Sequence, residues 1–85
     1  MKKIAVIGVI LENPASCQRA FNDVVSAHQH MVKGRMGLPF AAEEMAVVSI
    51  TVLGELDEIN ALTGKLGKIA HVTVKTAISG KDVSC

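Results

Sequence analysis

Apolar residues fall into four short runs along the chain, separated by polar segments with helical periodicity. The run at residues 3–11 is almost unbroken, and its β-branched composition predicts a strand covered on both faces. Residues 45–53 alternate between two sets of side chains, which predicts a second strong strand. The shorter runs at 31–36 and 71–78 carry charged side chains, which is typical of strands at a sheet edge.

Two segments between these strands have the spacing of amphipathic helices, at about residues 14–29 and 55–66. Their apolar stripes consist of Cys17, Phe21, Val24, Val25 and His28 in the first segment, and of Leu56, Ile59, Leu62 and Leu66 in the second. Asn13 is expected to cap the first helix. Residues 37–44 are predicted to form a connection, and residues 79–85 a loose tail.

The predicted order is therefore strand, helix, strand, strand, helix, strand, within a single domain over residues 1–78. This order is typical of the ferredoxin-like fold, an α+β sandwich in which two helices cover one face of a four-stranded antiparallel sheet. The first and third strands are central in that fold, and the second and fourth are edges. The charges of Lys33, Arg35 and Lys75 on the shorter strands agree with these positions.

The face of the sheet turned away from the helices is predicted to be apolar. The first strand is apolar on both sides, and the third offers Met45, Val47 and Leu53 on the side away from the helices. Soluble monomers rarely expose a contiguous patch of this kind, so we expect a homo-oligomer, either a dimer or a tetramer. The alternative is that residues 79–85 partly cover the patch.

Charge and cysteine content restrict the class of protein. Nine basic and eight acidic side chains leave a net charge of +1, whereas a direct DNA-binding protein would normally carry a basic face. Cys17 and Cys85 are too few for a disulfide framework, which favours reduced thiols in the cytoplasm. No run approaches the roughly 20 apolar residues that span a bilayer. We therefore expect a cytoplasmic protein that binds neither DNA nor a membrane directly.

No motif in the sequence indicates a metal site, a cofactor or catalysis. His28 and His30 lie near a predicted helix end, where a histidine also complements the helix dipole. Neither belongs to a Cys-x-x-Cys or His-Glu-x-x-His pattern, so we expect no metal. A metal-binding sensor or carrier that uses His28, His30, His71 and Cys17 is the alternative. An enzyme is a third possibility, because this fold hosts many activities, but no nucleophile or acid–base set supports it.

Residues 33–39 form the most distinctive stretch, in which two cations flank a glycine and a turn-forming Gly-Leu-Pro follows. The cations either protect an edge strand from aggregation or form the rim of a pocket between subunits that takes an anionic effector. The free N–H groups at the start of the first helix would contribute to such a pocket. The predicted ligand contacts are Asn13, Lys33, Arg35 and the backbone of Met36 and Gly37.

Residues 4–10, 34–39 and 61–67 resemble a small family described as regulators of the iron-only hydrogenase system. The resemblance covers residues 3–78 and implies a stand-alone ACT-like domain, similar to the tetrameric C-terminal domain of nickel-responsive repressors. The His-x-His pair and the cysteine of those repressors are missing here, as is their ribbon-helix-helix DNA-binding segment. The resemblance therefore implies a non-catalytic regulatory domain that binds a small effector or a protein partner.

Overall fold

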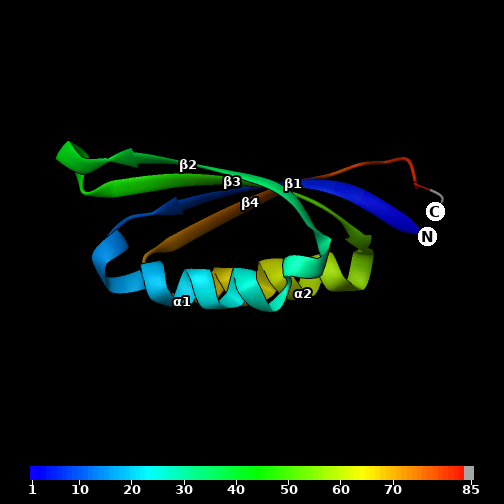
Figure 1. The fold of residues 1–85 in the computed structure, drawn as a ribbon, viewed down its shortest axis with the longest axis horizontal. Coiled ribbons are helices and arrows are strands. Elements are labelled where there is room, and N and C mark those ends of the chain that lie inside the picture. Colours follow the sequence, from blue (N-terminus) through cyan, green and yellow to red (C-terminus); the bar gives the residue numbers. More distant parts are fainter. Residues whose placement is uncertain (84–85) are drawn as a thin grey trace.

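The computed structural model describes residues 1–83, with the element order expected from the sequence (Figure 1). The strands and helices are β1 (Lys2–Leu11), α1 (Pro14–Ala27), β2 (Val32–Phe40), β3 (Met45–Glu55), α2 (Leu56–Gly67) and β4 (Val72–Ile78). Short 3-10 turns, η1 (Gln29–Met31) and η2 (Ala41–Glu43), precede β2 and β3. In residues 1–83, no helix is long and apolar enough to cross a membrane.

The four strands form one antiparallel sheet in the order β2-β3-β1-β4. Both helices lie on the same side of it, and the other side carries no helix (Figure 1). This arrangement confirms the ferredoxin-like fold and the central positions of the first and third strands. Within one chain, β1 is therefore covered on one face only, and not on both faces as predicted from the sequence, and Val6 and Ile10 are 48% and 40% exposed on its other face.

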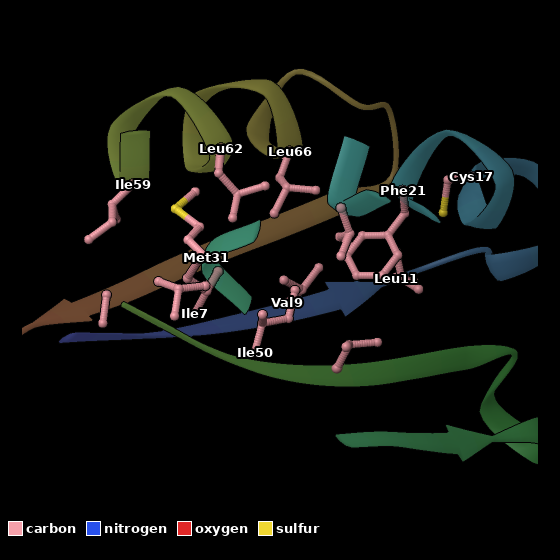
Figure 2. Packing of buried hydrophobic residues seen from close by; sticks show 14 residues of the cluster. Ile7, Val9, Leu11, Cys17, Phe21, Met31, Ile50, Ile59, Leu62 and Leu66 are labelled. Atoms are coloured by element: carbon pink, nitrogen blue, oxygen red, sulfur yellow. The ribbon is translucent and has the colours of Figure 1, made fainter. Parts of the chain in front are cut away.

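The core lies between the helices and the sheet. Alternate residues of β1 and β3 point toward the helices, including Ile7, Val9, Ile50 and Val52, and all four are fully buried. Figure 2 shows α2 adding Ile59, Leu62 and Leu66 to this layer, while α1 contributes Phe21 and Cys17. The alternation predicted for residues 45–53 is confirmed, with Val48, Ile50 and Val52 on the buried side.

Two predicted boundaries are wrong in the region between α1 and β3. Residues 37–40 were expected in a connection, but β2 continues through them to Phe40, opposite Met45 of β3. Proline is tolerated at Pro39 because β2 is an edge strand, where one side of the backbone has no strand partner. Met31 was expected to begin this strand, but it ends the η1 turn and fills the core with 1% exposure.

The segment after β4 runs beside the first residues of β1. The Ser79 N–H donates to the Ile4 carbonyl at 2.8 Å, and Lys2 and Val83 form an antiparallel bridge. Residues 79–83, which the sequence placed in a loose tail, therefore extend the β4 edge of the sheet. The predicted loose tail also included Ser84 and Cys85, which lie outside the described residues.

Candidate functional site

A cavity of about 560 Å³ lies between the first half of α1 and the β2–β3 hairpin. The hairpin is long because β2 continues to Phe40, and its tip reaches beyond the start of α1 (Figure 1). The helical wall consists of Asn13, Pro14, Ala15, Gln18, Phe21 and Asn22. The hairpin wall includes Arg35, Gly37, Pro39 and Glu44. The cavity therefore exists because the hairpin extends past the part of the sheet that α1 packs against.

The pleat of β2 turns Arg35 and Gly37 toward the helical wall of the cavity. Arg35 lies opposite Ile50, and Gly37 lies opposite Val48, and both partners are buried under the helices. Since residues paired across an antiparallel ladder share a face, Arg35 and Gly37 also face the helices. A Cβ placed on Gly37 would meet no atom within 4 Å, so its missing side chain leaves open space at the cavity wall.

Arg35 is the cationic group of the cavity. One guanidinium nitrogen, Nη2, donates to Asn22 Oδ1 at 3.3 Å, and the guanidinium carbon lies 5.5 Å from the centroid of the Phe21 ring. The ion pairs found within residues 1–83 do not include Arg35. A guanidinium has five N–H donors in a fixed fork, so most of them are available to a ligand that enters beside α1.

The start of α1 also opens on this cavity. Asn13 occupies the N-cap position, as predicted, but its side chain makes no capping hydrogen bond. Its carbonyl oxygen accepts instead from the Ser16 N–H and hydroxyl, each at 3.0 Å, and from the Cys17 thiol at 3.2 Å. The first turn has no acidic residue. The positive end of the helix dipole is therefore not neutralised by a side chain of α1 itself, and Glu44 of the hairpin is the carboxylate that lines the cavity beside it.

Three of the five predicted ligand contacts, Asn13, Arg35 and Gly37, line this cavity. Met36 does not, because it is opposite Ser49 on the other side of the sheet and is 63% exposed. Lys33 is also absent from the lining and lies at a bulge between Val32 and Gly34, where the pairing of β2 with β3 is interrupted. Alternation along a strand prevents neighbouring side chains from sharing one face, so Arg35 and Met36 separate.

Sequence analysis missed three polar residues of the cavity. Gln18 and Asn22 lie on the same face of α1, four residues apart, and Glu44 lies in the hairpin turn. The i, i+4 spacing of two amides beside Phe21 was a signal available in the sequence. This spacing indicates part of a binding site only once β2 is known to place Arg35 against the same face of the helix.

The histidines of the alternative metal site do not converge. Within residues 1–83 no group of three or more His, Cys, Asp or Glu side chains is placed to hold a metal ion. His30 Nε2 lies 2.7 Å from Glu58 Oε2 at the start of α2. The His71 carbonyl accepts from the Glu12 N–H, which follows β1 at its far end. His28 is buried, and its Nε2 has no hydrogen-bond partner in the described part of the chain.

We expect His28 to make the stability of the fold depend on pH. Burial, followed by the nearby positive charges of Lys65 and His30, lowers the pKa of His28 below its ordinary value of 6.5, against a smaller opposing effect of Glu58. The unfolded chain then binds a proton at a higher pH than the folded chain does. The free energy of unfolding should therefore be at its full value above pH 6.5 and fall as the pH drops below it.

Urea denaturation at pH 7.5 and pH 5.5 measures this dependence, with His28→Gln as a non-titrating control. We expect the wild-type protein to lose stability between the two pH values and the variant to lose less. Equal losses in both proteins would assign the pH dependence to other groups.

Comparison with known proteins supports the assignment of the fold and gives a family. The family model "TM1266-like: Iron-only hydrogenase system regulator, putative" matches residues 3–76. The structure of the uncharacterized protein TM1266 from Thermotoga maritima superposes with a TM-score of 0.88 and is 29% identical. That match covers 92% of this chain and 98% of the other. Both findings confirm the resemblance seen in the sequence. No protein of curated function matches.

More distant structures share only the fold. SnoaB, a cofactor-independent oxygenase from Streptomyces nogalater, matches with a TM-score of 0.58 and 10% identity over 99% of this chain and 97% of its own. CPII, a nitrogen regulatory PII-like protein from Thiomonas intermedia K12, matches with a TM-score of 0.51 and 17% identity over 94% and 99%. The fold is thus compatible with both an enzyme and a regulatory protein.

Proposed function

Since the chain belongs to the TM1266-like family of iron-only hydrogenase system regulators, we propose that it is a non-catalytic regulatory domain that binds a small anionic effector. The effector would occupy the cavity between α1 and the β2–β3 hairpin. The observation that carries this proposal is the guanidinium of Arg35, which lies in the cavity without a carboxylate partner in residues 1–83.

The chemistry of the walls favours an anionic group attached to an apolar body. A carboxylate or phosphate would accept two hydrogen bonds from the Arg35 fork and another from the Ala15 N–H, because Pro14 has no N–H and the Ser16 N–H already donates to the Asn13 carbonyl. Pro14, Pro39 and Ala41 supply accessible apolar wall for the rest of the molecule. Glu44 lies at the same cavity, and its negative charge would disfavour a ligand with many negative charges.

A role in binding rather than catalysis is supported by the residues of the cavity. Its lining in the described chain offers one cation, one carboxylate and amides, with no histidine, cysteine or serine that would form a nucleophile and base pair. Cys17, the nearest thiol in α1, is buried with its Sγ directed at the Asn13 carbonyl. CPII bound to ADP, AMP and bicarbonate shows that this fold can serve small-anion binding in a regulatory protein.

Regulation would follow from a difference in affinity between the empty and the occupied domain for a protein partner. The effector would join α1 to the projecting hairpin, and so change the mobility of a surface that a partner can contact. We place this domain in the cytoplasm as a homo-oligomer, with no direct contact to DNA, in keeping with the near-zero net charge.

Anion titration of the isotope-labelled protein by NMR tests the proposal, with benzoate and inorganic phosphate as probes. Saturable shifts are expected for the backbone amides of Ala15, Asn22 and Gly37, whereas Thr76 on β4 serves as the control. Shifts that do not saturate, or that centre on other parts of the molecule, would contradict binding in this cavity.

A further inference from the structure

The side of the sheet away from the helices, here called the open face, is apolar at its centre. Figure 1 shows that neither helix covers it. Seven large apolar side chains on it are each 38–63% exposed, namely Ile4, Val6, Ile10, Met36, Leu38, Phe40 and Met45. A water-exposed patch of this extent is uncommon on a soluble monomer and marks an interaction surface.

The strand register shows that these side chains form one patch. Ile10 and Leu38 both lie opposite Val47 of β3, one from each neighbouring strand. Phe40 lies opposite Met45 in the same ladder. Because partners across an antiparallel ladder share a face, the apolar surface is continuous across β2, β3 and β1.

Charged side chains on the open face stand at its margins. The register places Lys75 on the β4 edge, opposite Gly8, and pairs Lys2 with Glu55 where β1 begins and β3 ends. An apolar centre with a charged rim is the usual anatomy of a protein interface. The rim carries both signs, and the whole chain carries only +1, so a second identical copy meets little repulsion.

The shape of the open face decides between possible occupants. Four strands about 4.8 Å apart and about 8 residues long give a flat area on the order of 500 Å², before the relief of side chains is counted. Stable complexes bury about 800 Å² on each partner, so most of the face must be covered at once. A single helix is only about 10 Å wide and would leave much of it exposed, whereas another flat sheet matches it.

We infer that the open face is the interface between two copies of this chain, packed sheet against sheet. Every copy brings a sheet of the same width with its own apolar centre and mixed-charge rim. The inference specifies the self-association included in the proposed function. Leu38 and Met45 of the patch also line the cavity, but Val6 and Met36, the positions substituted below, do not, so the anion titration tests the cavity separately.

Light scattering of the full chain, together with lysine substitutions, tests the interface. We expect the wild-type protein at micromolar concentration to have at least twice the chain mass of 9.0 kDa. Val6→Lys and Met36→Lys each place a charge at the centre or flank of the patch. Because such a charge would be buried without a partner, the dissociation constant should rise at least ~100-fold.

Leu56→Lys is the matched control, since Leu56 is also exposed and apolar but begins α2, on the helix side of the sheet. We expect this variant to remain oligomeric. Circular dichroism verifies that each variant is folded, and Met36→Lys on the exposed edge strand decides the matter if Val6→Lys unfolds the chain. A wild-type mass of 9.0 kDa at all concentrations would overturn the inference. So would oligomers that persist in both open-face variants, or that Leu56→Lys dissociates equally well.

Discussion

Replacement of Phe21 by alanine is expected to lower the free energy of unfolding by ~3–5 kcal/mol. Phe21 is 1% exposed and extends from α1 toward the sheet beside Leu11 (Figure 2). Its removal would leave a cavity in a small core that has few other large side chains from α1. Domains of ordinary stability unfold at a cost of about 5–15 kcal/mol, so this loss is a large fraction of the total.

Urea denaturation at one fixed protein concentration measures the loss, because self-association would contribute to the apparent stability. Leu56→Ala is the matched control, an apolar truncation at a position that is 41% exposed, and it should change stability by less than ~1 kcal/mol. Phe21→Leu should cost less than Phe21→Ala because it leaves a smaller void. Equal stabilities for Phe21→Ala and Leu56→Ala would contradict the packing of α1 against the sheet.

Replacement of Arg35 by alanine is expected to weaken anion binding in the cavity by about 10- to 150-fold. This range corresponds to the ~1.5–3 kcal/mol of a hydrogen bond to a charged group. The fold should be preserved, because Arg35 is exposed and its described polar contact is one hydrogen bond to Asn22. Calorimetric titration with the anion that binds more tightly in the NMR experiment measures the change.

Lys33→Ala is the matched control for Arg35→Ala. It removes the same charge from the same strand, at a residue that does not line the cavity, so it should leave affinity nearly unchanged. Arg35→Lys should retain only part of the affinity, because an ammonium group lacks the planar fork. If Arg35 only protected the sheet edge, Arg35→Ala would bind the anion normally and would aggregate. Equal weakening by Arg35→Ala and Lys33→Ala would indicate general attraction instead of a site.

The hydrophobic pattern predicted the fold because each period is a property of local geometry. Alternation at residues 45–53 and the stripe through Phe21 and Val25 report which side of an element is buried, whatever it packs against. The same reasoning failed at Pro39, since a proline after Gly37 is a strong turn signal in isolation. The position of β2 at the edge of the sheet removes the conflict, because a proline is tolerated where one side of the backbone has no strand partner.

The candidate site was only partly predictable. Arg35 and Asn13 were found because a cation and a helix start are recognisable from local sequence. Lys33 and Met36 were assigned to the same site, but neither lines the cavity. Their placement depends on the register in which β2 pairs with β3, which the sequence alone does not show. The bulge at Lys33 and the pairing of Met36 with Ser49 fix that register. Asn22 joined the site through its contact with Arg35, which depends on how α1 docks on the sheet.

The sequence by itself determined the element order, the central and edge strands, and the apolar character of the open face, because these depend on residue type and period alone. The tertiary structure decided how far β2 extends, and with it the cavity beside α1. It also separated His28, His30 and His71, since His30 pairs with Glu58 while the His71 backbone pairs with Glu12. Residues distant in sequence meet only after helices and strands have packed, so a site built from them is a property of the packing and not of any one segment.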